Sequence, residues 1–341
     1  MDYRRLGNSN LRVSALCLGT MMFGGQTSMA VAADIVASAR AHGINFIDTA
    51  DIYNRGQSEK DLGRLLNGQR DEWVLASKLG FDFDRDLPAS LPLQMNRSRY
   101  SRRWLMQETE AILKRLDTDF LDILYLHCDY QDENFEETVR ALGDLIAAGK
   151  IRAFGLSNFR GWRIAEVVRL CGQAGVPLPV VCQPCYNLLN REPEIEVLPA
   201  CRNYGLGVVP YSPLARGVLT GKYLPGLPPA PDSRAGRGDR RILETEFREE
   251  SLVIAQKIKA RCDARGILPG HFAAAWVLAN RLVSSVIVGP RTLAHLEDVY
   301  GALEVNIDVQ DENFVDSLVV PGHASATGFN DPGYPFFGRM V

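Results

Sequence analysis

Eight short, almost continuously apolar runs alternate with longer amphipathic stretches, and this alternation is the feature that most constrains the fold. The runs lie at 15–20, 45–49, 73–78, 121–127, 151–157, 179–183, 207–212 and 284–289. Between them, stretches such as AVAADIVASARAHG and RWLMQETEAILKRL place apolar residues three and four positions apart, as on one face of a helix. Apolar strands separated by helices indicate a parallel sheet, and eight such units predict a closed (β/α)8 (TIM) barrel of the α/β class.

A doubly wound nucleotide-binding sheet is the main alternative fold, but no G-x-G-x-x-G follows a predicted strand. No linker, repeat or low-complexity segment divides the chain, so we expect one domain over residues 1–341. Three segments lie outside the eight units. We expect MDYRRLGNSNLRVS to form an N-terminal hairpin that caps the barrel bottom, the Pro-, Gly- and Arg-rich segment at about 223–242 to form a lid over the top face, and the tail at about 319–341 to fold back irregularly onto the body.

Composition and charge exclude several classes of partner. The chain is 46% hydrophobic and 23% charged, as is typical of a globular protein with a large core. Its net charge is −3 and it has no long basic run with interleaved aromatic residues, so nucleic acid is not an expected partner. MDYRRLGNSN does not resemble a signal peptide, and no run of ~18 uncharged apolar residues predicts a membrane span. We therefore expect a cytoplasmic protein with no membrane partner.

The seven cysteines cannot all pair, because their number is odd, and they lie in apolar segments. Both features are typical of reduced thiols rather than of a disulfide framework. Cys182 and Cys185 form a C-x-x-C pair, CQPC, which also fits a redox couple or half of a zinc site. No second pair and no group of histidines in the sequence completes such a site. We therefore expect two thiols on a buried strand and no bound metal.

The C-terminal ends of the predicted strands are where active sites lie in barrels of this class. The residues at or just after these ends are Asp48, Tyr53, Lys78, His127, Ser157, Asn158, Gln183, Tyr211, Ser212, Gly289 and Arg291. Each has an ordinary structural interpretation when taken alone; for example, Lys78 fits a surface group and His127 a hydrogen-bonded core histidine. Buried polar atoms cost free energy unless they are bonded, so polar residues after successive strands favour a shared site over packing.

Several of these residues stand in longer motifs. FIDTADIY, ASK, LYLH, GLSNF, QPCYNLLNRE, VVPYSPLARGVLTGKY and VIVGPRTLAHLEDVYGAL together resemble the aldo-keto reductase family over roughly residues 3–305. The combination is specific, although each motif alone is a weak signal. The resemblance implies a (β/α)8 fold, a nicotinamide dinucleotide bound without a Rossmann motif, and a catalytic tetrad at Asp48, Tyr53, Lys78 and His127.

The tetrad suits hydride transfer to a carbonyl carbon, because the carbonyl oxygen gains charge and must receive a proton. Tyr53 is the natural proton donor, since a free phenol has a pKa of about 10. A Lys78 ammonium ~4 Å away would stabilise the phenolate by about 4 kcal/mol at an effective dielectric near 20, which corresponds to a pKa lowered by about 3. Asp48 would keep Lys78 charged and oriented, and would give back part of that shift in pKa. His127 would donate a hydrogen bond to the carbonyl oxygen.

The resemblance also implies the residues that bind the nicotinamide end of the cofactor. Ser157, Asn158 and Gln183 would bind its carboxamide, and Tyr211 would stack on its ring. The other implied contacts up to the pyrophosphate are Thr20, Met21, Asp48, Ser212, Leu214, Arg216, Gly217 and Lys222, with Ser233 and Arg234 closing over it from the lid. A solvated loop is the alternative interpretation of the lid arginines.

The adenosine end is expected at VGPRTLAHLEDVY. Gly289 ends the last strand, Arg291 is placed for a 2′-phosphate, and a helix that begins near Thr292 presents free N–H groups to an anion. Where many members of the family have Gln and Asn, this chain has His295 and Val299, while Asp298 keeps an acidic adenine contact. The expected cofactor is NADP(H), with NAD(H) as an alternative.

The expected substrate is a small carbonyl compound, or its alcohol in the reverse reaction. The contacts implied are Met22, Phe23, Tyr53, His127 and Asp129, with further walls from 81–100 and the tail. These aromatic, thioether and charged groups suit a sugar-derived aldehyde or a polycyclic ketone equally well. The sequence leaves the reaction direction and the oligomeric state open.

Two other functions fit a barrel of this kind. A redox-sensing regulatory subunit would bind the cofactor and turn over slowly, as some channel-associated relatives of this fold do, but the intact tetrad favours an enzyme. A metal-dependent sugar isomerase would need clustered carboxylates and histidines at the strand ends, and here only Asp48 and His127 are present.

Overall fold

The computed structural model describes residues 1–81, 99–130, 132–328 and 331–334. Eight parallel strands form one sheet in the order β10-β3-β4-β5-β6-β7-β8-β9. They are β3 (Leu16–Gly19), β4 (Phe46–Asp48), β5 (Val74–Leu79), β6 (Leu121–Leu126), β7 (Ile151–Ser157), β8 (Val181–Gln183), β9 (Gly207–Val208) and β10 (Val286–Val288). The Ser284 amide donates to the Val208 carbonyl oxygen at 2.8 Å, and the Ile287 amide to that of Pro210 at 3.0 Å, which closes the ring. The predicted eight-stranded barrel is confirmed.

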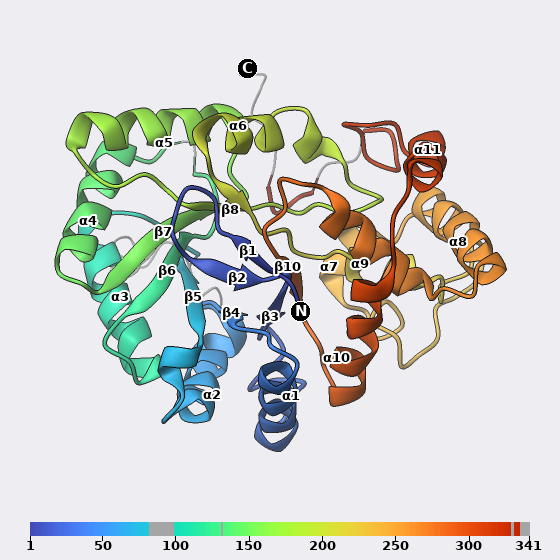
Figure 1. Cartoon of the computed structure of the whole chain (residues 1–341), viewed down its shortest axis with the longest axis horizontal. Helices are drawn as coiled ribbons and strands as arrows, with labels where there is room; N and C mark the ends of the chain where they lie inside the picture. Colours follow the sequence, from blue (N-terminus) through green and yellow to red (C-terminus); the bar gives the residue numbers. More distant parts are fainter. Residues whose placement is uncertain (82–98, 131, 329–330, 335–341) are drawn as a thin grey trace.

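Helices surround these strands (Figure 1). They are α1 (Met29–Ala41), α2 (Gln57–Leu66), α3 (Arg102–Leu116), α4 (Phe135–Ala147), α5 (Gly161–Ala174), α6 (Val197–Tyr204), α7 (Arg240–Glu244), α8 (Glu249–Ala264), α9 (Pro269–Ala279), α10 (Leu293–Val299) and α11 (Val309–Leu318). Short 3₁₀ helices are η1 (Tyr53–Gly56), η2 (Arg70–Glu72), η3 (Glu192–Glu194), η4 (Ala215–Thr220) and η5 (Tyr300–Glu304). Within the part of the chain that the structure describes, no helix has the length and apolar character needed to cross a membrane.

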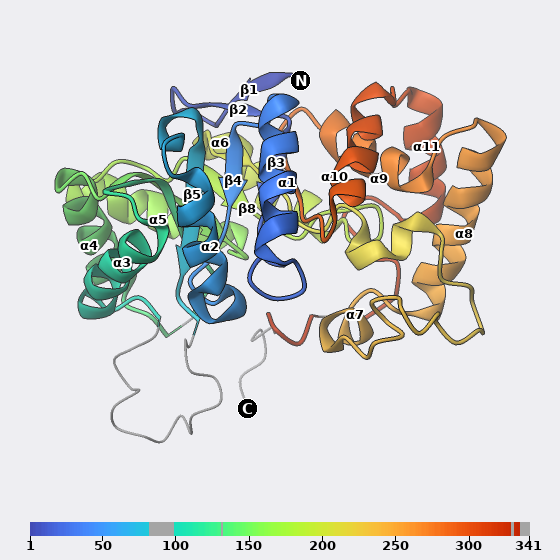
Figure 2. The ribbon, with the colours of Figure 1, turned by 90° about the horizontal axis from the view of Figure 1, so that it is seen from below.

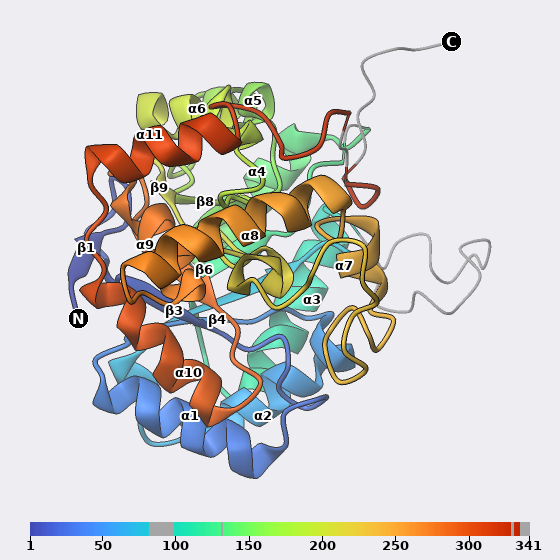
Figure 3. The same cartoon turned by 90° about the vertical axis from the view of Figure 1, so that its right-hand side faces the viewer.

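Local sequence explains where several helices begin and which face they bury. The side chain of Asn134 caps α4 by accepting from the amide of Glu136, and Phe135, Val139 and Leu142 then form the buried face of that helix. In α11, Asp308 forms a reciprocal capping box. A salt bridge from Arg261 to Asp311 joins α8 to α11, which lies with α8 and α9 on one flank of the molecule (Figure 3).

The core has two layers because alternate strand residues face opposite sides of the sheet. In β3, Leu16 and Leu18 belong to the large layer between strands and helices, whereas Cys17 belongs to the smaller layer inside the barrel. Leu6 and Val13 of the N-terminal hairpin also join the inner layer. The hairpin therefore closes the barrel interior with apolar side chains.

The hairpin consists of β1 (Tyr3–Arg5) and β2 (Arg12–Ser14), which pair antiparallel. Gly7 adopts a φ of +55°, and a Cβ there would come within 2.4 Å of the Gly207 nitrogen, so a side chain does not fit at this contact with the beginning of β9. The predicted cap at the bottom of the barrel is confirmed. Figure 2 shows the hairpin at one end of the molecule and α7 at the other.

The described part of the C-terminal tail packs against the loop after β8. The Arg191 amide donates to the His323 carbonyl oxygen at 3.0 Å, and the Ser325 amide donates to that of Leu189 at 2.8 Å. These bonds bring the tail to the end of the barrel at which the parallel strands terminate, opposite the hairpin.

Candidate active site

Three strand ends bring the four tetrad residues together. Asp48 is the last residue of β4 and pairs with Ala76 of β5. Lys78 lies two residues after Ala76 and therefore faces the same side, the barrel interior. His127 follows β6 directly, and Tyr53 begins η1 after the loop from β4. The structure thus places all four side chains at the C-terminal end of the barrel.

Lys78 is fully buried and uses its ammonium group in three contacts. Its Nζ donates to Asp48 Oδ2 at 2.5 Å, to the Thr49 carbonyl oxygen at 2.8 Å and to the Tyr53 hydroxyl at 3.2 Å. Burial alone would lower the pKa of Lys78, but Asp48 and then Tyr53 outweigh it, so the pKa is raised. Lys78 is therefore charged, and the Tyr53 oxygen accepts from it, which leaves the phenolic proton free to point elsewhere.

The pKa of Tyr53 differs from the sequence-based prediction. Lys78 does lower this pKa as predicted, but burial raises it by more, and Asp48 and Asp51 add to the rise, so the net shift is upward. The prediction of a net lowering neglected the cost of moving a phenolate out of water. Tyr53 in this structure therefore holds its proton at neutral pH.

His127 is an aromatic neighbour of Tyr53. The two rings meet edge to face with centroids 6.1 Å apart, and Phe81 packs against His127 at 4.6 Å. His127 is only 7% exposed. The imidazole and the phenol are thus direct neighbours at the C-terminal end of the barrel.

The residues predicted to bind a carboxamide form a connected network beside the tetrad. Gln183 donates to Asp48 Oδ1 at 2.9 Å, and Ser157 donates to the Gln183 carbonyl oxygen at 3.1 Å. Asn158 donates to the His127 carbonyl oxygen at 2.9 Å and accepts from the Tyr211 hydroxyl at 2.7 Å. The structure therefore links these side chains to the catalytic candidates.

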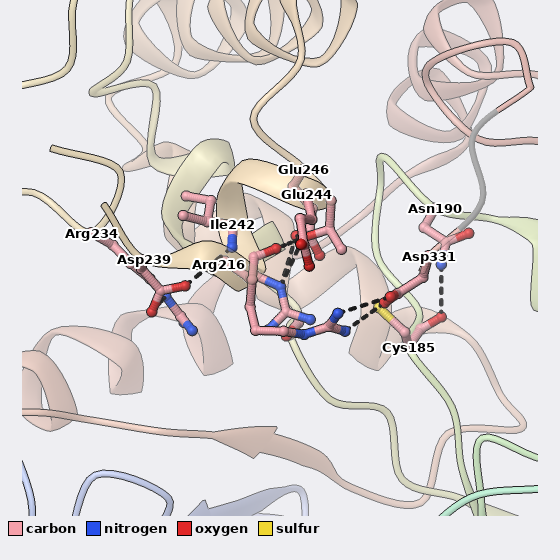
Figure 4. Close-up of polar contacts among 12 residues, drawn as sticks. Cys185, Asn190, Arg216, Arg234, Asp239, Ile242, Glu244, Glu246 and Asp331 are labelled. Atoms are coloured by element: carbon pink, nitrogen blue, oxygen red, sulfur yellow. Dashed lines mark hydrogen bonds and ion pairs between the residues drawn. The ribbon is translucent and has the colours of Figure 1, made fainter. Parts of the chain in front are cut away.

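The segment predicted for the pyrophosphate has unusual backbone geometry. Ser212, Arg216 and Gly217 have φ values of 57°, 53° and 96°, while Leu214 precedes η4. The Nε of Arg216 donates to Glu246 Oε2 at 2.8 Å in a pair whose side chains are each 8% exposed, so one donor of this guanidinium is already bonded to a buried acid (Figure 4). Glu246 lies 30 residues away, so the sequence motif gave no sign of this pairing.

The predicted lid residues bond mainly within their own segment. Ser233 donates to the Ala230 carbonyl oxygen at 2.6 Å, and Arg234 pairs with Asp239 at 2.9 Å. Asp239 also caps α7 through the Ile242 amide. The structure therefore gives this loop a defined shape, and closure of Ser233 and Arg234 over a pyrophosphate stays a prediction.

A cationic group forms at the predicted adenosine end. Burial and then the charges of Arg291 and Lys222 lower the pKa of His295, so the three side chains lie near one another. The Thr292 hydroxyl caps α10 by accepting from the His295 amide, as the predicted helix start requires. Asp298 instead bonds to His271 at 3.2 Å. Gly289, after β10, is exposed.

The loop after β3 is divided between core and surface. Thr20 is buried and donates to the Asp48 carbonyl oxygen at 3.2 Å, whereas Met21 is 38% exposed and Met22 partly so. Phe23 is fully buried in the hydrophobic core, so its predicted contact with a substrate is not supported. The ring packs among apolar side chains, and its position in the sequence alone did not reveal this burial.

Asp129, another predicted substrate contact, is held by Arg163 at 3.0 Å and is almost buried. Burial raises its pKa, while Arg163 opposes the rise. Of the predicted wall at 81–100, residues 82–98 lie outside the described residues.

The cysteines are free thiols. Cys182 is buried in β8, and Cys201 of α6 raises its pKa through a hydrogen bond, together with burial. Within the described ranges, no group of three or more His, Cys, Asp or Glu side chains could hold a metal ion. Cys182 thus lies on a buried strand as predicted, whereas Cys185 follows the end of β8 and is partly exposed.

Two structural features near Tyr53 were missed by the sequence argument. The Asn54 side chain donates to the carbonyl oxygens of Met21 and Phe23 at 3.0 and 2.7 Å and ties η1 to the neighbouring loop. Behind the barrel wall, Glu59 accepts from Ser77 and from Arg115 at 2.5 and 2.6 Å. Glu59 shares a helix face with apolar Leu62 and Leu66, and an acid at such a position could have signalled a buried role.

Asp51, buried next to this network, provides a stability test. Burial raises its pKa well above the usual range, Glu59 and Glu108 add to the rise, and Arg115 offsets only part of it. A carboxyl group whose pKa is higher in the folded than in the unfolded protein favours folding at low pH, and this contribution is lost as the pH rises. The free energy of unfolding of Asp51→Asn should therefore increase relative to that of wild type as the pH rises from 4.5 to 8.

Urea unfolding of both proteins across this pH range measures the difference. Asp71→Asn, at an exposed position, is the matched control and should show a pH-independent difference from wild type. A constant difference for Asp51→Asn as well would show that Asp51 is ionised in the folded protein.

Comparison with known proteins now adds to this geometry. The model of the Aldo/keto reductase family matches residues 15–320. The chain is 36% identical to a Bacillus subtilis protein named uncharacterized oxidoreductase YrpG (90% of this chain, 93% of the relative). It is 33% identical to a probable voltage-gated potassium channel subunit beta of Arabidopsis thaliana (89% and 92%). It is 32% identical to an L-glyceraldehyde 3-phosphate reductase of Escherichia coli strain K12 (89% and 88%).

Two of these three relatives are named as an oxidoreductase and a reductase, and the match covers every strand of the barrel. Oxidoreductase chemistry on a carbonyl group is therefore supported. This chain belongs to the aldo/keto reductase family.

Proposed function

We propose that the protein is an NADPH-dependent reductase that converts an aldehyde or ketone to the alcohol, with Tyr53 as the proton donor. The observation that carries the proposal is the set of three contacts made by buried Lys78, which fix both Asp48 and Tyr53. A cation held in this way orients the phenol and leaves its proton for a substrate oxygen.

The residues present fit a nicotinamide dinucleotide. Asn158 and Gln183 offer amide groups beside the tetrad, Tyr211 offers an aromatic face, and Arg291 and Lys222 form a positive site for a phosphate. When bound, the cofactor would supply the hydride. We expect the segment at 223–242 to cover it, and Arg216 to support that segment through Glu246 rather than contact the pyrophosphate.

The chain's own residues would perform the rest of the reaction. Tyr53 and His127 would bond to the carbonyl oxygen and polarise it, since their rings lie next to each other. Tyr53 would then transfer its proton to that oxygen. Lys78 would stabilise the phenolate left behind, and Asp48 would keep Lys78 charged.

The direct test is purified protein with NADPH and a panel of aldehydes and ketones, without added metal, followed by the cofactor's absorbance. Rapid carbonyl-dependent oxidation of NADPH is expected. Cofactor binding with only very slow oxidation across the panel would contradict the proposal.

That contrary outcome would favour a cofactor-binding, redox-sensing regulatory subunit, the second candidate. The 33% identity to a probable potassium channel subunit beta is the observation in its favour. Such a subunit would bind the cofactor tightly and report its oxidation state to a partner rather than process substrate at a metabolic rate.

Arg291→Ala tests the preference for NADPH. A charge-assisted hydrogen bond contributes ~1.5–3 kcal/mol, or roughly 10–150-fold in affinity, and only NADPH has a 2′-phosphate to lose. The substitution should raise the NADPH dissociation constant at least about tenfold and leave NADH binding nearly unchanged. NADPH binding should also become less dependent on salt concentration. Tryptophan fluorescence quenching measures both affinities.

Arg281→Ala, at an exposed position before β10, is the matched control and should bind both cofactors as wild type does. Equal losses for the two cofactors in Arg291→Ala would mean that Arg291 supports its loop instead. Equal wild-type affinities would mean that His295 and Val299 have shaped a site for either cofactor.

A further inference from the structure

Two arginines hold a short piece of the C-terminal tail at residues 331–334. Arg241, on α7, forms a bidentate salt bridge with Asp331, in which Nη1 lies 2.9 Å from Oδ1 and Nη2 lies 2.7 Å from Oδ2. Arg160, at the beginning of α5, donates to the Tyr334 carbonyl oxygen at 3.1 Å. The tail is thus held through a carboxylate and a carbonyl oxygen, much as a bound ligand would be.

This piece of tail borders the candidate active site. Asp331 and Tyr334 line a cavity of about 680 Å³ together with Asn158, Cys185 and Tyr211. Figure 4 shows Asp331 beside Cys185. Burial raises the pKa of Tyr334, and Tyr53 is among the nearby groups that add to the rise. The Asp331 carboxylate therefore lies near the place where the far end of a substrate would be expected.

The two lid-side arginine pairs differ in exposure. Arg216 and Glu246 are each 8% exposed, and breaking a pair so deeply buried would leave an uncompensated charge. Arg241 and Asp331 are 35% and 18% exposed, where water can compensate either partner. The Arg216 pair is therefore a fixed part of the fold, whereas the Arg241–Asp331 pair is open to water and to a competing anion.

We propose that Arg241 is a substrate subsite for an anionic group, which Asp331 occupies when no substrate is bound. The favoured substrates would then be aldehydes or ketones that carry a carboxylate or phosphate at a distance from the carbonyl. The forked geometry around Asp331 is the one in which a guanidinium recognises such anions most strongly. The substrate assignment rests on the proposed carbonyl reductase function, but the anion site does not.

Binding is measured first, by calorimetry on the full chain with benzoate and phenyl phosphate as probes. Arg241→Gln should weaken the binding of at least one anion by about tenfold or more. Asp331→Asn should strengthen it, because the competing carboxylate is gone. The matched control is Arg240→Gln, which removes the same charge from a side chain that is 85% exposed and paired with Glu244; it should change neither affinity.

Turnover is measured next, as the ratio of kcat/KM for 4-carboxybenzaldehyde to that for benzaldehyde. Arg241→Gln should lower this ratio about tenfold, while Arg240→Gln keeps it. Anion binding that depends on Arg241, in a protein that reduces neither aldehyde, would support the site and reject the reductase function. Aldehyde reduction with no effect of Arg241→Gln on either anion or on the ratio would reject the site.

Asp331→Asn distinguishes a ligand site from a simple tie between tail and lid. If this variant weakens anion binding as much as Arg241→Gln does, the pair only holds the tail in place and the proposal is wrong. Stronger binding in Asp331→Asn supports the exchange of one carboxylate for another.

Discussion

Replacing Tyr53 with Phe is expected to lower kcat about 10²–10⁴-fold while leaving the affinity for NADPH unchanged. The change removes only the hydroxyl, so the proton donor is lost. The network of Asn158, Gln183 and Tyr211 does not contact this hydroxyl and should keep its geometry. Steady-state kinetics with the best aldehyde of the panel, together with fluorescence titration of NADPH, measures both effects.

Tyr204→Phe, in α6, is the matched control and should retain wild-type kinetics. A fall of less than about tenfold in Tyr53→Phe would mean that another group donates the proton. His127 would be the first to test in that case, because its ring lies next to that of Tyr53.

Replacing Lys78 with Met is expected to destabilise the protein by about 3–5 kcal/mol and to abolish most activity. The variant leaves the Asp48 carboxylate buried without its cation, and Tyr53 loses the donor that orients it. Urea unfolding at pH 7 measures the loss of stability, and the aldehyde assay below the unfolding transition measures the loss of turnover.

A second variant separates the two effects. Lys78→Met combined with Asp48→Asn removes both charges, so most of the stability should return while activity stays low. If Lys78→Met alone were as stable as wild type, Asp48 would not be an uncompensated anion in that variant. If the double variant recovered activity, a catalytic role for Lys78 would be excluded.

The eight strands could be predicted because their signal is local. Each apolar run needs burial on both faces, and each intervening helix shows its period within a dozen residues, so no knowledge of distant partners is required. The order of the barrel then follows from short right-handed connections between neighbouring strands. The hairpin cap was predictable for the same reason, since its turn lies between two short strands.

The predicted positions of Asp48, Lys78 and His127 relied on the same logic. Parallel strands carry their last residues to one end of a barrel, so polar residues at successive strand ends must lie near one another. Their proximity follows from the fold class, before any contact between them is known.

The sequence by itself thus determined the barrel, its open and capped ends, and the meeting of the tetrad. Only the tertiary structure decided that Phe23 is buried, that Arg216 is paired with Glu246 and that Arg241 holds Asp331. It also reversed the expected net shift in the pKa of Tyr53. The reason is that periodicity reports which face of an element is buried, whereas charge pairing and desolvation depend on atoms brought together from loops far apart in the chain.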